Sequence, residues 1–465
     1  MIALALVANA VAFFLILLFL IRCRFFTIYS GLFVYLAFHF IVFVQRPVVV
    51  YLFDLRSQYL YMRYMPTDEV FVETMLASNI GLLSFVLGYL VAIGFAPLRP
   101  SFMLPQVSPV QRNAFGLSLL LLSPLMLYSF FLAFTLRQGY GSDVLSELGQ
   151  LNLRIDPETG SRLYVDNTAY IIGARNMALP FATFFVVLKR GKWWSYLPLV
   201  LCALVDLQLG ERWAIVVSAL VICLMALYFR GRTQFTVPQY AMMALVLVAF
   251  IALGQNRDAI VKFILTGEFD LGFDLRSSSL GDHPDFANFE FLNYVIGKVP
   301  DVSGTYSYFT QYLGVFTQPI PRALWPEKPV GSPVVLVNLD AYGNFAGMTT
   351  SLVGDGWISL GYIGIVITTG LAGAFYGWLF KRFTARTVSV YYFCAYFWMV
   401  ALLLQWARDG GYRILDFFFF CLFGIALALG FEHTLLRIGG PAPPALRASA
   451  GSALLRPPSI QGGRE

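Results

Sequence analysis

The stretch GIVITTGLAGAFYGWLFKRFTARTVSVYYFCAYFWMVALLLQWARDG, residues 364–410, decides the fold class. Two apolar runs flank the basic segment 381–387, and each belongs to a run long enough to cross a hydrocarbon core of ~30 Å as a helix. The second run ends at Arg408 and Asp409. This alternation indicates an integral membrane protein whose charged residues lie in the connections between helices.

The same alternation continues along the whole chain. Hydrophobic residues make up 58% of the 465 residues, charged residues only 12%, and the mean hydropathy is +0.70. This composition is far from that of a soluble globular domain. We expect an all-α polytopic integral membrane protein with about eleven transmembrane helices. The predicted spans are residues 2–21, 27–45, 71–96, 114–136, 168–188, 193–209, 213–229, 237–254, 357–380, 388–406 and 414–431.

Basic residues indicate the side of each connection. One set of short connections carries 12 Lys and Arg and no acid. Nearly all Asp and Glu before Glu432 lie in the alternate set, where basic residues are sparser. Short loops rich in Lys and Arg stay in the cytoplasm, so we expect the N-terminus outside and the C-terminus inside. The basic connections are residues 22–26, 97–113, 189–192, 230–236 and 381–387.

The predicted spans divide the chain into four parts. They are residues 1–254, with eight spans and external loops at 46–70 and 137–167; residues 255–350, a large external loop; residues 351–437, with three spans; and residues 438–465, a disordered cytoplasmic tail. Within the large loop, 287–298 and 305–317 have the apolar spacing of short interfacial helices. Gly373 and Gly377 have the spacing of a close helix-packing face.

The distribution of polar residues excludes several kinds of chemistry. The five cysteines lie within or beside predicted spans and the three histidines are scattered, so we expect no disulfide framework, metal site or cofactor. An enzyme that uses nucleotide sugars needs cytoplasmic carboxylates to hold a divalent cation, and none precedes Glu432. The chain contains no phosphate-binding loop, and we expect no nucleic-acid partner.

Two external clusters offer cations for an anionic ligand. Glu211 and Arg212 lie at the outer end of the predicted seventh span, where an ion pair that anchors the helix is an equal alternative. The proline-rich segment QPIPRALWPEKP, residues 318–329, carries Arg322, Trp325 and Lys328. Its four prolines stiffen the backbone, which favours either an anion-binding segment or a rigid lid.

The third cluster surrounds Asp355. This residue lies between two glycines in VGDGWISLGYIG, residues 353–364, and we group it with residues 405–413, which contain Arg408 and Asp409. Both segments flank predicted spans on the outer side. Two other positions stand alone: Arg175 within the fifth span, which is a site or a helix–helix clamp, and Arg257 in the large loop. The aromatic residues around Tyr312 suit sugar stacking, although an aromatic belt at the membrane interface fits better.

The segment IPRALWPEKP, followed by GDGWISLGYIG, resembles the Wzy-type O-antigen and oligosaccharide repeat-unit polymerases. The long outer loop and the number of spans also fit that family. The resemblance implies a GT-C-like helical bundle, similar to the O-antigen ligases, in the bacterial inner membrane with its active site facing the periplasm. It also implies transfer of a growing glycan from one undecaprenyl diphosphate to another lipid-linked repeat unit, without metal, and with membrane lipids and a chain-length regulator as partners.

The resemblance carries over to Arg322, Trp325, Pro326, Lys328 and Asp355. From it and from the residues on the outer side, we expect a base at Asp355, with Glu211 and Asp409 as alternatives. We expect the lipid diphosphate to bind Arg212, Arg322, Arg408 and Lys328, with Arg175 and Arg257 as further candidates, and the sugars to bind Trp325 and Tyr312. An O-antigen ligase-like transferase and a transporter of lipid-linked oligosaccharides remain open as alternatives.

Overall fold

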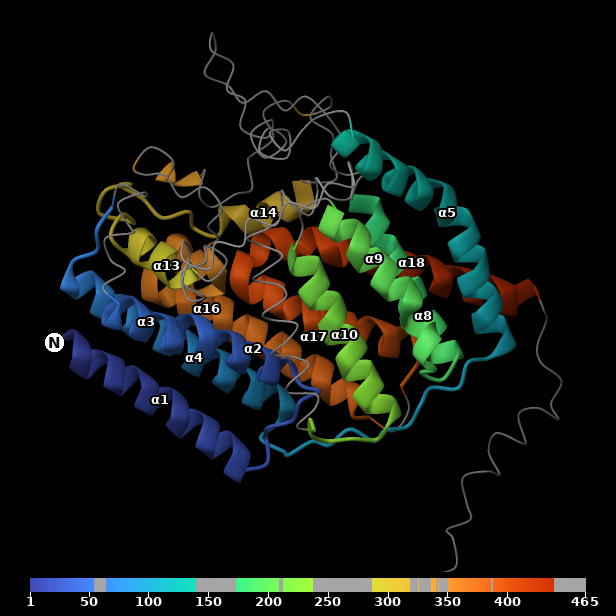
Figure 1. Ribbon diagram of the computed structural model, residues 1–465, viewed down its shortest axis with the longest axis horizontal. Helices are drawn as coiled ribbons and strands as arrows, with labels where there is room; N and C mark the ends of the chain where they lie inside the picture. Colours follow the sequence, from blue (N-terminus) through green and yellow to red (C-terminus); the bar gives the residue numbers. More distant parts are fainter. Residues whose placement is uncertain are drawn as a thin grey trace, which may run out of the picture.

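A computed structural model describes residues 1–53, 64–138, 173–208, 212–236, 287–317, 325, 336–339, 342, 350–385 and 388–438. The described part is helical, and it contains no strand. Figure 1 shows long helices that pack side by side as a bundle. The helices are α1 (Ile2–Arg22), α2 (Gly31–His39), η1 (Phe40–Gln45), α3 (Arg46–Leu52), α4 (Asp68–Ile93), α5 (Pro109–Gln138), η3 (Ala174–Met177), α8 (Ala178–Leu188), η4 (Trp193–Tyr196), α9 (Leu197–Gln208), α10 (Arg212–Phe229), α13 (Asn288–Ile296), α14 (Thr310–Thr317), α16 (Ser351–Phe383), α17 (Val390–Asp409) and α18 (Gly411–Ile438).

Seven helical stretches of the described chain are long and apolar enough to cross a membrane. They correspond to the first four and the last three predicted spans. The fifth, sixth and seventh predicted spans contain shorter apolar helices, and the eighth, residues 237–254, lies outside the described residues. The chain therefore has the helices of a membrane-embedded protein, while the number of eleven and the orientation stay predictions.

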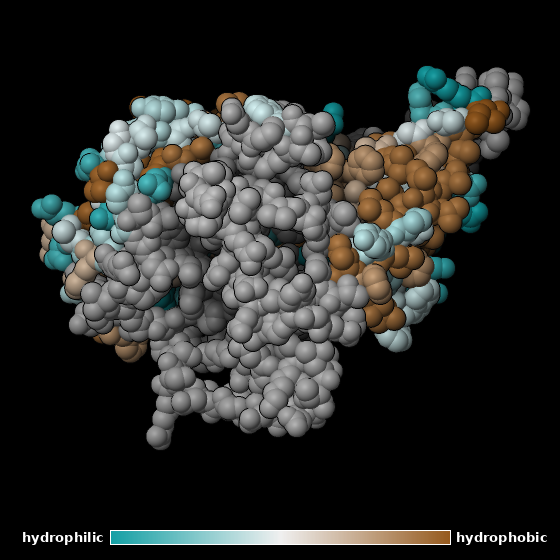
Figure 2. Space-filling model, turned by 90° about the horizontal axis from the view of Figure 1, so that it is seen from above, coloured by the Kyte–Doolittle hydropathy of each residue, from teal (hydrophilic) through white to brown (hydrophobic). Residues whose placement is uncertain are grey.

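The surface of the described part is also that of a protein in lipid. Figure 2 shows a broad apolar area, coloured brown, on the right of the view. α5 and α18, which lie on that side in Figure 1, expose many large apolar side chains. Leu120, for example, is 71% exposed in α5. Such a surface is stable in contact with lipid tails, whereas its exposure to water is unfavourable.

The closest packing in the bundle joins α4 to α16. A Cβ atom at Gly373 would lie 2.0 Å from the carbonyl oxygen of Phe85, and one at Gly377 would lie 2.5 Å from that of Tyr89. The prediction of a close helix-packing face at these two glycines is confirmed. Small residues let the two backbones touch, which is how membrane helices gain contact without a hydrophobic driving force.

The predicted charge partition corresponds to two ends of the bundle. At one end the basic connections meet, since the Tyr29 hydroxyl donates to the carbonyl of Arg232 and Lys381 Nζ donates to the carbonyl of Ala92 at 3.5 Å. At the other end the N-terminal part of α16 meets the junction between α17 and α18, through Asp355 and Gly411. The carboxylates described below all lie at this second end, which we call the acidic end.

The short helices predicted within 287–298 and 305–317 are confirmed as α13 and α14. Every residue of α13 is buried, and the helix packs against α4 and α16 rather than lying on the surface as expected. Glu290 of α13 forms a buried ion pair with Arg46, with Oε1 and Nη2 separated by 2.5 Å. Arg46 directly follows the π-helix η1, and the Phe43 carbonyl in η1 accepts a hydrogen bond from Asn9 at 2.7 Å.

α16 is broken near its N-terminal end. Leu360 and Gly361 have non-helical backbone angles, with φ of +57° at Gly361. The carbonyl groups of Ile358 and Ser359 accept hydrogen bonds from the backbone N–H groups of Ser307 and Tyr308, at 2.8 and 3.1 Å. The segment before α14 therefore satisfies backbone groups next to the break, as membrane helices require. The sequence predicted a continuous ninth span at residues 357–380, without this break.

Candidate functional site

Asp355 lies at the centre of the acidic end and is completely buried. Its Oδ2 accepts two hydrogen bonds of 2.8 Å, one from the Tyr312 hydroxyl and one from the backbone N–H of Gly411. Its Oδ1 is buried, and within the part of the chain that the structure describes no donor reaches it with regular hydrogen-bond geometry, although the Gln311 side chain lies near the carboxyl group. A buried carboxylate oxygen without a donor is costly, and such groups are a frequent mark of functional sites.

Glycines at the junction of α17 and α18 allow this arrangement. Gly410 has φ +80° and ψ 177°, a conformation that is essentially restricted to glycine. A Cβ atom there would lie 2.9 Å from Thr350 Oγ1 and 3.1 Å from Asp355 Cγ. At Gly411 a Cβ atom would lie 2.4 Å from the Tyr312 ring. The chain thus passes against Asp355 because no side chain intervenes.

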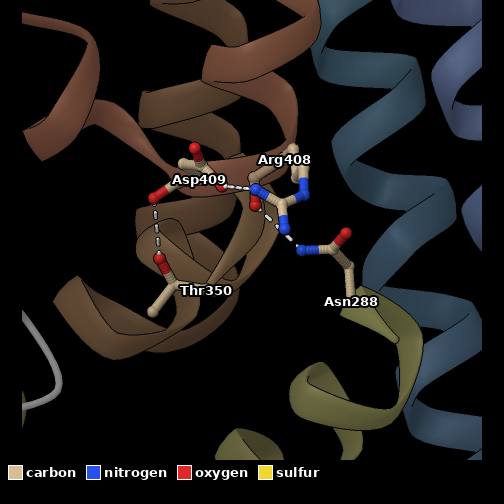
Figure 3. Close-up of polar contacts among 4 residues, drawn as sticks. All are labelled: Asn288, Thr350, Arg408 and Asp409. Atoms are coloured by element: carbon tan, nitrogen blue, oxygen red, sulfur yellow. Dashed lines mark hydrogen bonds and ion pairs between the residues drawn. The ribbon is translucent and has the colours of Figure 1, made fainter. Parts of the chain in front are cut away.

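Arg408 and Asp409 form an ion pair beside this junction, with Nη1 and Oδ1 separated by 2.7 Å. Figure 3 shows how their backbone is held. Asn288 Nδ2 donates to the Arg408 carbonyl at 2.8 Å, and Thr350 Oγ1 donates to the Asp409 carbonyl at 3.1 Å. Arg408 is only 8% exposed. A guanidinium with so little exposure keeps a fixed direction, which suits recognition of an anion.

The structure brings together four of the predicted site residues: Asp355, Tyr312, Arg408 and Asp409. The grouping of 353–364 with 405–413 is therefore confirmed as a spatial arrangement. Tyr312 was expected to contact sugar, but its hydroxyl binds Asp355. Burial, followed by the nearby Asp355 carboxylate, raises the pKa of Tyr312 well above its usual value, so the phenol is a hydrogen-bond donor at neutral pH.

The remaining predicted residues divide into two groups. Arg175 is buried in the turn η3 before α8, where its backbone N–H donates to Ser129 Oγ of α5 at 3.1 Å. Arg212 is the first residue of α10, and Trp325 is 39% exposed. The other candidates, Glu211, Arg257, Arg322 and Lys328, lie outside the described residues, as does Pro326.

Several contributors to the site were not predicted from the sequence. Thr350, Asn288 and the two junction glycines position Arg408, Asp409 and Asp355. The Gly410–Gly411 pair between two apolar runs was a signal for a tight helix–helix junction, but nothing local marks Asn288, which is 120 residues from Arg408. Within the described residues, no group of three or more His, Cys, Asp or Glu is placed to hold a metal ion.

Taken with the fold, the site defines a helical, membrane-embedded protein with a buried carboxylate and an ion-paired arginine at one end of the bundle. Comparisons with protein-family models, with curated proteins and with solved structures found no match to this chain. The chemistry of the acidic end is therefore the main guide to function.

Proposed function

We propose that the protein is a glycosyltransferase that polymerises undecaprenyl-diphosphate-linked oligosaccharide repeat units of O-antigen or a related surface polysaccharide. The observation that carries this proposal is the buried Asp355, whose Oδ2 accepts a hydrogen bond from the backbone N–H of Gly411, three residues after Arg408. A base and a cation at the same end of an apolar bundle are what lipid-to-lipid sugar transfer needs. The partial resemblance to the Wzy-type polymerases points to the same reaction.

In this proposal Asp355 is the base for the acceptor sugar. The acceptor hydroxyl attacks the anomeric carbon of the donor glycan, its proton passes to Asp355, and the bond from that carbon to the lipid diphosphate breaks. A single displacement of this kind inverts the anomeric configuration. Because Tyr312 and Gly411 cover Oδ2, the acceptor hydroxyl reaches the carboxylate only by displacing the Tyr312 hydroxyl or by using Oδ1.

Arg408 is proposed to neutralise the departing diphosphate. Its planar guanidinium matches two phosphate oxygens, and it exchanges its contact with Asp409 for the ligand. Asp409 would then stabilise the empty site by pairing with Arg408 between turnovers. The predicted cations at Arg322 and Lys328, and the predicted sugar contact at Trp325, belong to the same proposal.

The proposal also includes the side of the membrane on which the acidic end lies. The proposed location of the acidic end is the periplasmic side of a bacterial inner membrane, where undecaprenyl-linked repeat units are presented; the short basic connections at the opposite end support a cytoplasmic location for that end. A chain-length regulator and lipids are the proposed partners. A transporter of lipid-linked oligosaccharides is a second candidate, because transporters often bind substrate where a helix is broken, as α16 is at Leu360–Gly361.

The decisive experiment uses the purified full-length protein in liposomes with its lipid-diphosphate-linked repeat unit. A ladder of longer glycans without added nucleotide supports the polymerase, and unchanged substrate that has crossed the bilayer supports the transporter. Transfer of the glycan to lipid A core supports the ligase. Arg408→Gln tests the site, because loss of the guanidinium should lower the rate of polymerisation at least ~100-fold. Arg22→Gln, on the exposed end of α1, is the matched control and should leave the rate unchanged.

A further inference from the structure

A cavity lies on a face of α16 other than the one that carries Asp355. It has a volume of about 450 Å³, within the range of small-molecule binding sites. Its walls come from the N-terminal part of α4, from the segment 296–306 and from the part of α16 around the break at Leu360–Gly361. Non-helical backbone in a membrane helix is tolerated where it lines a cavity, so the break and the cavity are one feature.

The lining of this cavity combines aromatic rings with carboxylates. The rings are those of Tyr306, Trp357 and Tyr362, and the carboxylates are those of Glu73 and Asp301. The ring centroids of Trp357 and Tyr362 are 4.9 Å apart, with the rings edge to face. The two side chains are therefore fixed relative to one another.

Hydrogen bonds hold the polar ends of these side chains. The Tyr362 hydroxyl donates to Glu73 Oε1 at 3.1 Å, and Trp357 Nε1 donates to the Val299 carbonyl at 2.8 Å. Burial, then the charges of Asp301, Tyr308 and Glu73, raise the pKa of Tyr306. The carboxylates of Glu73 and Asp301 line the same cavity as Tyr306.

We infer that this cavity binds a neutral or amino-bearing sugar of the oligosaccharide substrate, at a subsite separate from Asp355. A sugar presents apolar C–H faces to aromatic rings and hydroxyl donors to carboxylate groups, each of which accepts up to about four hydrogen bonds through its two oxygens. The same carboxylates repel a uronic acid or a diphosphate. The inference rests on the proposed function only in taking the sugar to be part of the substrate.

The position of the cavity indicates how far the bound sugar lies from the reacting one. Asp355 and Trp357 are two residues apart on a helix, so their side chains point about 200° apart. Asp355 faces the α17–α18 junction, whereas Trp357 faces the cavity and Val299. Because a helix with its side chains is about 10 Å across, the cavity holds a sugar remote from the reacting one. It would recognise the composition of the repeat unit rather than take part in the bond change.

The two faces are coupled through one short segment. Gln311 Nε2 donates to Ser359 Oγ at 2.6 Å, and Ser307 Oγ donates to Gln311 Oε1 at 2.8 Å. Tyr306 of the cavity and Tyr312 of the Asp355 site lie on either side of this pair of hydrogen bonds. A sugar in the cavity is thus in a position to order the segment that covers Asp355.

The test is direct binding of the purified full-length protein, in lipid nanodiscs, to an array of oligosaccharides that end in neutral, amino or uronic acid sugars. Wild type should bind neutral or amino members and discriminate against uronic acids at least ten-fold. Glu73→Gln and Tyr306→Ala should weaken binding at least ten-fold. Tyr128→Ala is the matched control, since Tyr128 is 52% exposed on α5 and does not line the cavity.

A third variant guards against a folding defect in Glu73→Gln or Tyr306→Ala. Ile363 is 62% exposed at the rim of the cavity, so Ile363→Trp should fill the cavity without disturbing the core, and it should also abolish binding. No binding to any neutral or amino sugar, a preference for uronic acids, or equal binding by wild type and the cavity variants overturns the inference. Sugar binding that maps to the cavity, in a protein that forms no polymer, leaves the inference intact and overturns the proposed polymerase.

Discussion

The backbone N–H of Gly411 donates a hydrogen bond of 2.8 Å to Oδ2 of Asp355, which joins the start of α18 to the N-terminal part of α16. This contact links residues 56 positions apart and fixes the carboxylate of Asp355, which is fully buried at the acidic end. Because a backbone donor cannot be moved by a rotamer change, Asp355 has one orientation while the junction is intact.

Replacing Asp355 by Asn tests its role as base. The amide keeps the size of the side chain and accepts both hydrogen bonds through its oxygen, but it cannot take up a proton. We expect polymerisation to fall at least ~100-fold, as the loss of a general base usually causes. Polymer length on gels from a complemented deletion strain measures this. Asp68→Asn, in the first turn of α4, should give wild-type polymer; equal activity in both variants would remove Asp355 from the mechanism.

Gly410→Ala should destabilise the protein. Alanine at φ +80° and ψ 177° is strained, and its Cβ would crowd Thr350 and Asp355, so we expect a loss of about 1–3 kcal/mol. Thermal unfolding in detergent measures it. Gly304→Ala is the matched control, because Gly304 also has a positive φ of 70° but has no atom within 4 Å of the added Cβ. An equal loss in both variants would mean that crowding at Asp355 is unimportant.

The Arg46–Glu290 ion pair should stabilise the fold only when both residues are present. Both side chains are buried, with relative exposures of 7% and 6%, so Arg46→Met or Glu290→Met alone leaves one charge of the pair in the interior. Such single changes typically cost about 3–5 kcal/mol, whereas the joint replacement Arg46→Met/Glu290→Met should recover most of the loss. Unfolding temperatures of the four proteins form a double-mutant cycle. Additive losses would show that the two residues act independently.

Tyr312→Phe should remove a stabilising hydrogen bond to a carboxylate, at a cost of about 1.5–3 kcal/mol. The folded-state pKa of Tyr312 is raised above its usual value, so its contribution is fully present below the unfolded-state pKa of about 10 and is lost as the pH rises above that value. The difference in stability between wild type and Tyr312→Phe should thus be constant from pH 7 to 9 and shrink above pH 10. Tyr308→Phe, at an exposed position, should show no difference at any pH.

The sequence predicted the features that depend on composition and alternation. Apolar runs marked seven helical stretches that are long enough to span a membrane. The rule that alternate connections share a side correctly grouped Asp355 with Arg408 and Asp409. The side of the membrane on which a connection lies depends only on the number of spans before it, because each span reverses the direction of the chain. Errors of several residues at helix ends therefore do not change the predicted side.

Lateral neighbours could not be predicted in the same way. Arg46 and Glu290 are 244 residues apart, and no local pattern distinguishes their pairing from others on the same side. The break at Leu360–Gly361 lies in a run whose sequence is that of one continuous apolar span. It could not be predicted locally, because the N–H groups that bind the carbonyls next to it belong to Ser307 and Tyr308, far earlier in the chain. The cavity follows from that break and was missed with it. Apolar composition serves lipid contact and helix contact equally well, so it does not say which face meets which helix.

The π-helical turn η1 has a consequence for the spacing of the chain. A π-helical turn holds one more residue than an α-helical turn, so removing a single residue from Phe40–Gln45 would restore the α-helical repeat. The wide turn takes up the extra residue locally, so the helix beyond it keeps nearly the direction that it would have without that residue. If the same six residues were wound as α-helix instead, everything beyond them would rotate by about 100° relative to α2, which would carry Arg46 off Glu290. The π-helical turn therefore lets one continuous helix contact α1 through Phe43 and α13 through Arg46. Loss of one residue within the turn should disturb these contacts less than insertion of a residue elsewhere in the helix.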